Sequence, residues 1–358
     1  MNPQPDLPIV RVGSTAGLLS VIPRLLGFTL DTSLVIVGTT PPSGRVQLVF
    51  RYDLPQPPDP GLAADIAGHA VSVLASHHVA TVTVAGYGPG PLVTPVADAI
   101  RDAAAYNGLD LRDVLRVHDG RYWSYLRPDP SCCPAEGVPF DPAAHPAGAA
   151  MAAAGLPALA DRAELAATIA PLTGPPAEEM LAATRRIERA ATRLITRDGE
   201  RGLDKPGLAA VRQAIGVYRD GGSLDSPEVH AWLALVLIRL PVRDDAWARM
   251  DPAHREAHRR LWTDVVRRAQ PGYLAAPATL LAFTAWQCGD GALANIALDR
   301  ALADTPGYSM ALLIQRALDA GTPPSVAFLP MTPEDVAASY ADPGEGDADH
   351  PGAPPAGD

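Results

Sequence analysis

The chain has 358 residues, of which 47% are hydrophobic, and this is enough for two domains with separate cores. Its formal net charge of −11 excludes a general nucleic-acid-binding protein, because such proteins need an excess of basic side chains to neutralise phosphates. Its single lysine, Lys205, stands in Asp-Lys-Pro, so the Gly-Lys-Ser/Thr signature of a phosphate-binding P-loop is absent.

The first third of the chain alternates between strand-like and helix-like segments. We expect a short strand at 8–12 and a helix from Ser14 or Thr15 to about Leu26, closed by Gly27. Further strands are predicted at 33–38, 45–54, 79–88 and within 114–126, and further helices at 60–78 and 91–108. In the helix at 60–78 the apolar positions expected to face inward are Leu62, Ile66, Val71 and Leu74.

The strands at 33–38 and 45–54, joined by the turn-rich segment 39–44, suggest a first hairpin. A second hairpin is predicted around Asp119-Gly120, because this dipeptide between β-rich arms favours a two-residue turn. His118 and Arg121 would then face each other across the hairpin, and Trp123 and Tyr125 would pack on a helix or on the second region. Strand–helix alternation followed by a hairpin predicts an α/β domain, with a mixed sheet and flanking helices.

From about residue 145 onward only helical patterns remain. The predicted helices are 145–155, 160–170, 177–197, 206–219, 226–240, 253–268, 277–288, 291–304, 308–320 and 332–340. The Pro/Gly-rich segment 171–179 marks the expected boundary. We therefore expect an α/β domain with trailing helices over 1–172, an all-helical region over 173–340, and a disordered acidic tail over 341–358.

Small residues recur at regular spacing in one predicted helix pair. Read from Ala275, they are Ala282, Gly289, Ala294 and Ala301, followed by Pro306. This spacing resembles a tetratricopeptide (TPR) unit of 34 residues, in which close helix contact needs small side chains. It predicts a TPR-like, repeat-like stack of helices.

Several segments together resemble an actinobacterial family known as domain of unknown function 4192. They are LLSVIPRLLGF (18–28), DTSLVIVG (31–38), VAGYG (84–88), DGRYWSYL (119–126), CCPAEGVPF (132–140) and PVRDDAW (241–247). The resemblance runs from about residue 10 to about 325 and implies a cytoplasmic protein of uncharacterised activity. In the family a further cysteine often follows the WSYL segment; Arg127 stands there in this chain, which weakens a three-thiol metal site.

Cys132 and Cys133 are the candidates for a metal site, near His118 and His145 in the sequence. Adjacent thiols rarely bind one tetrahedral ion, and no second Cys pair exists, so we interpret them as a tight turn and expect neither metal nor cofactor. Whether they are redox-active or structural is left open. His254 and His258 stand at i, i+4 but lack the zinc-protease pattern, so we interpret them as a solvated face.

The glycine-rich turn Gly86-Tyr87-Gly88-Pro89-Gly90-Pro91 follows a strand and precedes a helix, which is the context of a phosphate-binding loop. Its two prolines remove backbone N–H donors, so we interpret it as a tight turn. Because α/β sheets bind ligands at the carboxyl ends of their strands, we still expect a candidate small-ligand crevice here. Its residues would be Asp31, Asp53, Tyr87 and Glu136.

Four arginines follow one another at i, i+4 spacing in the helix predicted at 177–197: Arg185, Arg189, Arg193 and Arg197. On a helix they form one basic stripe, and like charges at this spacing repel. The stripe is either balanced by acidic residues of this chain or by solvent, or it binds an anionic partner, whether a protein, a small anionic ligand or RNA.

Two hypotheses about function follow. The first is a cytoplasmic, non-enzymatic binding protein with a helical contact surface for a protein partner. The alternative is a small-ligand or nucleotide-handling enzyme that acts at the strand ends of the α/β domain. We expect no membrane segment, since no run of about eighteen apolar residues occurs, and the first residues lack a secretory signal pattern.

Overall fold

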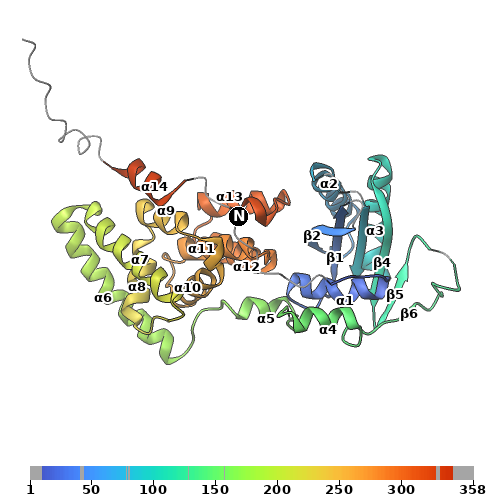
Figure 1. Cartoon of the computed structure of the whole chain (residues 1–358), viewed down its shortest axis with the longest axis horizontal. Helices are drawn as coiled ribbons and strands as arrows, with labels where there is room; N and C mark the ends of the chain where they lie inside the picture. The colour runs from blue at the N-terminus through green and yellow to red at the C-terminus, as the bar shows by residue number, and fades with distance from the viewer. Residues whose placement is uncertain are drawn as a thin grey trace, which may run out of the picture. The chain divides into compact units, whose positions relative to one another are not determined.

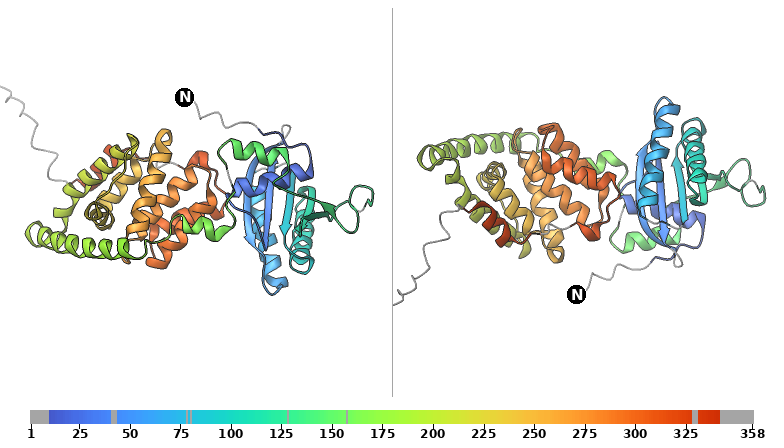
Figure 2. Two further views of the ribbon diagram at one scale, coloured as in Figure 1. Left: turned by 90° about the horizontal axis from the view of Figure 1, so that it is seen from below. Right: turned by 90° about the horizontal axis from the view of Figure 1, so that it is seen from above.

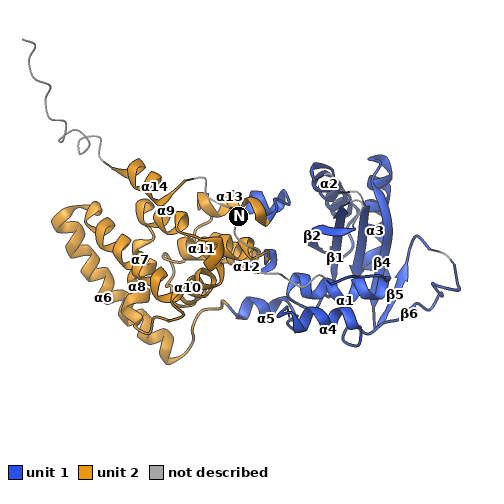
Figure 3. Ribbon diagram, viewed as in Figure 1, with its two compact units in different colours: residues 1–168, 290–293, 315–323 blue, residues 169–289, 294–314, 324–358 orange. Residues whose placement is uncertain are grey.

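The computed structural model describes residues 10–40, 44–77, 79, 81–127, 129–156, 158–327 and 331–341. The chain divides into two compact units (Figure 3). Unit 1 comprises residues 1–168, 290–293 and 315–323, and unit 2 comprises 169–289, 294–314 and 324–358. Of the predicted strand at 8–12, residues 10–12 are not in a strand and the rest lie outside the described residues, as do residues 342–358 of the predicted tail.

Unit 1 is built on one six-stranded mixed sheet in the order β2-β1-β3-β4-β5-β6 (Figure 1). Its strands are β1 (Ser33–Thr40), β2 (Arg45–Asp53), β3 (Thr81–Tyr87), β4 (Asp110–His118), β5 (Arg121–Ser124) and β6 (Val138–Pro139). Among the strands of the described sheet, β3 and β4 pair in parallel and the other neighbours are antiparallel. The α/β class and the mixed sheet predicted from the sequence are confirmed.

Helices α2 (Pro60–Ser76) and α3 (Gly90–Tyr106) cover one face of this sheet. They bury a common core with the inward side chains of β1, β3 and β4, namely Leu34, Ile36, Val82, Val84 and Val114. The prediction that Leu62 faces inward is wrong, because it is 51% exposed. The predicted Val71 and Leu74 are buried, together with the small Ala63, Ala67 and Ala70, which let the helix lie close to its neighbours.

Helix α1 (Thr15–Leu26) begins and ends as its sequence predicts. The Ser14 hydroxyl accepts a hydrogen bond from the Gly17 amide at 3.1 Å, and Gly27 ends the helix in the left-handed conformation with φ of 82°. α1 packs against α4 (Pro146–Ala153), and the short α5 (Arg162–Ala167) follows.

The predicted hairpin at Asp119-Gly120 is confirmed. Both turn residues have positive φ, 47° and 67°, and His118 faces Arg121 across the strands. Tyr125 reaches α3, where its hydroxyl lies 2.7 Å from Thr94 Oγ1. Trp123 differs from the prediction, because the Arg116 guanidinium stacks 3.8 Å from its ring centroid and its indole N–H donates to the Ala135 carbonyl.

Unit 2 is helical, and α12 and α13 run through both units. The helices are α6 (Pro175–Asp198), α7 (Asp204–Arg219), α8 (Pro227–Val236), α9 (Leu240–Ala248), α10 (Arg255–Arg268), α11 (Ala275–Gln287), α12 (Gly291–Asp304), α13 (Ser309–Asp319) and α14 (Pro333–Tyr340), with 3₁₀ turns η1 (Glu200–Leu203), η2 (Pro252–His254) and η3 (Pro324–Val326). The helix predicted at 226–240 ends earlier than expected: α8 stops at Val236, and α9 begins at Leu240 with Pro241 in its first turn. No helix among the described residues is both long and apolar enough to cross a membrane.

Helix α11 is buried along its whole length, with α10 packed beside it. The predicted small contact residues Ala282, Ala294 and Ala301 have no exposed surface, as close helix contacts require. The carboxylate of Asp304, which ends α12, accepts hydrogen bonds from the Leu274 and Ala275 amides at the start of α11. The TPR-like repeat itself stays a prediction.

Candidate functional site

The exposed side of α6 carries the four arginines singled out in the sequence. This 24-residue helix begins with two prolines and buries Met180, Ala183, Thr184 and Ala191 on its inner side. Half a helical turn away, Arg185, Arg189, Arg193 and Arg197 are all exposed. We call these four residues the arginine face; Figure 2 shows α6 along its length.

Among the described residues, one member of the arginine face is paired with a carboxylate. Arg197 donates two hydrogen bonds to its neighbour Asp198, the shorter at 2.6 Å. Arg186, just beside the face, pairs with Glu228 of α8. Among the residues that the structure describes, no carboxylate pairs with Arg185, Arg189 or Arg193. Three like charges therefore stand about 6 Å apart along the helix axis, open to solvent.

A cavity of about 440 Å³ lies close to the end of α6, between α7, α9 and α14. Its apolar lining includes Leu208, Ile238, Leu240, Pro241, Val336 and Tyr340, and its charged lining includes Arg201, Asp204, Arg212, Arg239 and Asp245. Ile238 and Leu240 are each about half exposed. The chain leaves the described part of the structure at Ala341, which also lines this cavity.

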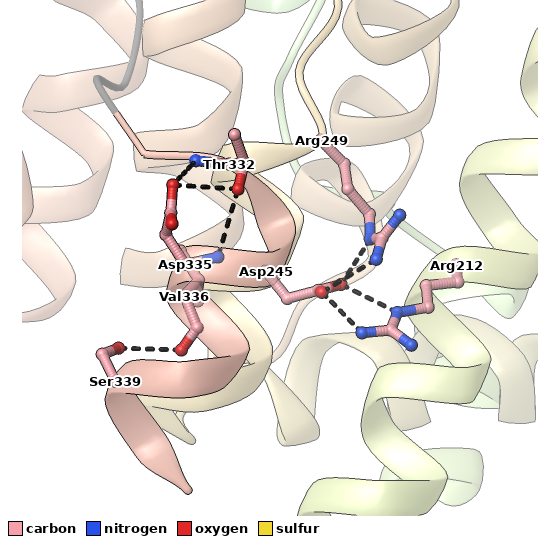
Figure 4. A network of polar contacts seen from close by, with 7 residues as sticks. All are labelled: Arg212, Asp245, Arg249, Thr332, Asp335, Val336 and Ser339. Atoms are coloured by element: carbon pink, nitrogen blue, oxygen red, sulfur yellow. Dashed lines mark hydrogen bonds and ion pairs between the residues drawn. The ribbon is translucent and has the colours of Figure 1, made fainter.

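The carboxylate of Asp245 is the centre of the polar contacts in this cavity (Figure 4). It is 2% exposed and accepts two hydrogen bonds each from Arg212 of α7 and from Arg249, at 2.7–3.1 Å. Burial alone would raise the pKa of Asp245, but the bonds from Arg212 and Arg249 outweigh it and hold the pKa below its usual value. Asp245 is therefore a charged structural link between α7 and α9.

The neighbouring Asp244 connects α9 to α14. Its carboxylate accepts hydrogen bonds from Tyr340 at 2.5 Å and from Arg243 at 2.8 Å. The start of α14 is closed by a capping box between Thr332 and Asp335 (Figure 4). The segment PVRDDAW thus supplies two paired carboxylates to helix packing, and neither is free to act as a base. The sequence did not reveal this role, because Arg212 and Tyr340 are 33 and 96 residues away from the aspartates they bind.

Three of the four predicted crevice residues lie at one end of the sheet in unit 1. Ser33 at the start of β1 pairs with both Asp53 and Tyr87, and Asp31 precedes it by two residues. Asp53 is exposed and forms an ion pair with Arg51 at 2.5 Å. Tyr87 is buried, which raises the pKa of its phenol, and its hydroxyl has no hydrogen-bond partner among the described residues.

Glu136 does not join them. It is an exposed residue of the loop before β6, and β4 and β5 separate β6 from β3 in the sheet. The crevice therefore stays a prediction, for which the sheet register brings together Asp31, Asp53 and Tyr87 only.

The two adjacent thiols form a turn of their own. The Cys132 and Cys133 amides both donate to the Asp129 carbonyl, and the two Sγ atoms lie 3.6 Å apart. Desolvation and then the contact with Cys132 raise the pKa of Cys133, which opposes thiolate formation. His145 caps α4 and His118 lies beside Asp119. Within the described ranges, no three His, Cys, Asp or Glu side chains are grouped so that they could hold a metal ion.

His258 does not lie on a solvated face, as its charged neighbours suggested, because it is 2% exposed. The signal was present in the sequence: His258, Leu261, Trp262 and Val265 recur at helical spacing and form the buried side of α10. His254 is half-exposed and pairs with Asp251 at 2.7 Å. Of the two histidines at i, i+4, His258 therefore lies in the core and His254 lies at the surface.

Comparison with known proteins gives one result. A family model described as "Domain of unknown function (DUF4192)" matches residues 16–325. Neither the curated proteins nor the solved structures yield a match.

Proposed function

The chain belongs to the DUF4192 family, whose description names no activity, and from this premise we propose that it is a cytoplasmic binding protein whose helical unit contacts an acidic protein through the arginine face of α6. The observation that carries the proposal is the set of three exposed arginines, Arg185, Arg189 and Arg193, for which the described part of the chain offers no carboxylate partner. Adjacent like charges on a helix destabilise it by a few tenths of a kcal/mol per pair, about 0.2–0.5. A bound acidic partner would offset that repulsion.

The surroundings of the arginine face favour a protein over a small anion or RNA. Leu181 lies one turn before Arg185 on the same side of α6 and is 40% exposed, and Ile195 on its flank is 38% exposed. Apolar side chains beside arginines suit a protein surface, where aliphatic contacts accompany charge pairing.

The alternative, an enzyme or nucleotide-handling domain at the strand ends, has less support. Asp53 is paired with Arg51, so it is not a free base, and Glu136 belongs to a different part of the sheet. The feature that favours a ligand there is the buried Tyr87 hydroxyl, which has no hydrogen-bond partner within the described ranges.

The test is capture of partners from the native cell extract on the immobilised full chain, with mass spectrometry as the readout. The variant carries Arg189→Glu and Arg193→Glu. Replacing attraction by repulsion at two positions should lower capture of an acidic partner about tenfold, since each exposed pair contributes up to about 1 kcal/mol. The interaction should also weaken as salt is raised.

A matched control changes the net charge equally but far from α6 in the sequence: Arg11→Glu with Arg112→Glu, two exposed residues of unit 1. The control should capture the same acidic protein as the wild type. If the α6 variant and the wild type capture the same proteins in the same amounts, the proposal is wrong.

A further inference from the structure

We infer that residues 342–358 of this chain bind along the arginine face of α6 and compete there with the acidic partner. This inference deepens the proposed function, because it assigns a second, intramolecular occupant to the same surface. Three properties support it: the charge of the segment, the spacing of its acids, and the point at which it leaves α14.

The charges are complementary. The segment contains five acids, Asp342, Glu345, Asp347, Asp349 and Asp358, and neither lysine nor arginine. α6 offers Arg185, Arg189 and Arg193, which have no carboxylate partner among the described residues.

The spacing of the acids fits the spacing of the arginines. Glu345, Asp347 and Asp349 alternate with Gly346 and Ala348, so an extended chain presents all three carboxylates on one side, about 6.6 Å apart. Arginines at i, i+4 on a helix stand about 6.0 Å apart along its axis. Three acids can therefore meet three arginines in register, with no rearrangement of α6.

The segment begins close to the end of α6, from which it could extend along the arginine face. Ala341 lines the 440 Å³ cavity together with Arg201, which follows the end of α6 at Asp198 by three residues. From Asp198 back to Arg193 the helix rises about 8 Å, and to Arg185 about 20 Å. Eight extended residues from Ala341 to Asp349 span about 26 Å, which is enough to follow α6 from its end to Arg185. The pairing would then be Glu345 with Arg193, Asp347 with Arg189, and Asp349 with Arg185.

Weak ion pairs are sufficient for this segment to bind α6, because the segment belongs to the same chain. Three exposed ion pairs at roughly 0.2–1 kcal/mol each total at most about 3 kcal/mol, so a free peptide would bind with a dissociation constant of several millimolar or weaker, on the order of 6 mM at best. A short tether gives an effective concentration in the millimolar range, about the same as that dissociation constant. The bound and released forms would both be populated, and an acidic partner could displace the segment.

The experiment uses the full chain in a form with an uncharged segment, Glu345→Gln, Asp347→Asn and Asp349→Asn. A fluorescent synthetic peptide of residues 342–358 is titrated into it at low salt, and fluorescence anisotropy reports binding. We expect the peptide to bind at low salt. Binding should be lost in about 0.5 M salt, and it should also be lost in the chain that carries Arg189→Glu and Arg193→Glu. The wild-type chain should bind the same peptide about threefold more weakly, because its own segment competes.

A second peptide separates register from net charge. Exchanging positions 347 and 348 keeps composition and charge but moves one carboxylate to the other side of the extended chain. It should bind several-fold more weakly than the native peptide. If the two peptides bind equally, the proposed pairing of alternate acids with the arginines is wrong. If the wild-type chain and the chain with the uncharged segment bind the peptide equally, residues 342–358 do not occupy α6 of their own chain.

The outcomes also separate this inference from the proposed function. If the peptide does not bind but the α6 variant loses its captured partner, the inference fails and the proposed function stands. If the peptide binds but capture is the same for every variant, the proposed function fails and the segment is the occupant of α6. A peptide that binds equally to the chain with and without Arg189→Glu and Arg193→Glu occupies another surface, and the inference is wrong.

Discussion

His258 lies on the buried side of α10 among apolar residues, and only 2% of its surface is exposed. Burial, and then the nearby charge of Arg219, lowers the pKa of His258 to about 4. Asp251 and His254 are the other titratable groups that act on it. In the unfolded chain the pKa of histidine is about 6.5, so the folded form binds the proton more weakly than the unfolded form.

The free energy of unfolding should therefore fall as the pH falls. The contribution of His258 is fully present above about pH 6.5 and is lost between about 6.5 and 4, at a maximum cost of about 3 kcal/mol. We predict that His258→Leu removes a large part of the stability difference between pH 8 and pH 5. Urea unfolding followed by tryptophan fluorescence measures this, since Trp232, Trp247, Trp262 and Trp286 all lie in unit 2.

The control is His118→Gln, which removes a histidine that is 36% exposed in unit 1 and should keep the wild-type difference. His230, whose pKa is also lowered by burial, would leave a smaller residual slope in both variants. An unchanged difference in His258→Leu would show that this imidazole is not the source.

At the scale of elements, local chemistry predicted the turns and caps, whereas side-chain pairing depended on tertiary contacts. Ser14, Gly27 and Asp119-Gly120 act through residues within four positions of themselves, so the sequence sufficed. The arginine face was predictable for the same reason, because i, i+4 spacing determines which side of a helix a residue occupies.

The sequence predictions that failed concern features that depend on packing and on contacts between residues distant in the chain. Arg212 and Asp245 are 33 residues apart, so their pairing could not be read from spacing. The break between α8 and α9 was missed because the apolar run 233–238 continues through it, although Pro241 marked a helix start. Leu62 matched the helical period, but in the first half of α2 the buried residues are Ala63 and Ala67, and Leu62 is left exposed.

The left-handed backbone conformation of Gly120, in the turn of the second hairpin, can be tested by substitution. Gly120 has φ of 67°, which an L side chain adopts only at a cost, so Gly120→Ala should lower the free energy of unfolding by about 1 kcal/mol. Gly216 lies within α7 and a methyl group there would meet no atom within 4 Å. Gly216→Ala should therefore stabilise the protein by up to about 1 kcal/mol. Thermal melting followed by circular dichroism compares them; a neutral Gly120→Ala would contradict the turn geometry.

At the scale of the whole molecule, the two units are not two consecutive stretches of chain. Residues 315–323, near the end of the helical part, belong to unit 1 with the sheet. His77 Nε2 at the end of α2 lies 2.9 Å from the Ala320 carbonyl oxygen. A methyl group added at Gly321 would lie 2.7 Å from Val73 and 3.3 Å from Leu48, so this glycine fits closely against α2 and β2.

The α/β domain cut out as residues 1–168 should therefore be less stable than unit 1 in the full chain. Loss of one hydrogen bond and of the apolar contacts at Val73 and Leu48 predicts a decrease of about 2 kcal/mol, measured by hydrogen exchange of the β1 and β3 amides. Gly321→Ala in the full chain tests the same contact without a cut, because its methyl group would collide with Val73 and strain a φ of 67°. Gly307→Ala is the control, since nothing lies within 4 Å of its methyl position. Equal protection of β1 and β3 in the fragment and in the full chain would mean that residues 315–323 rest on the sheet unit without stabilising it.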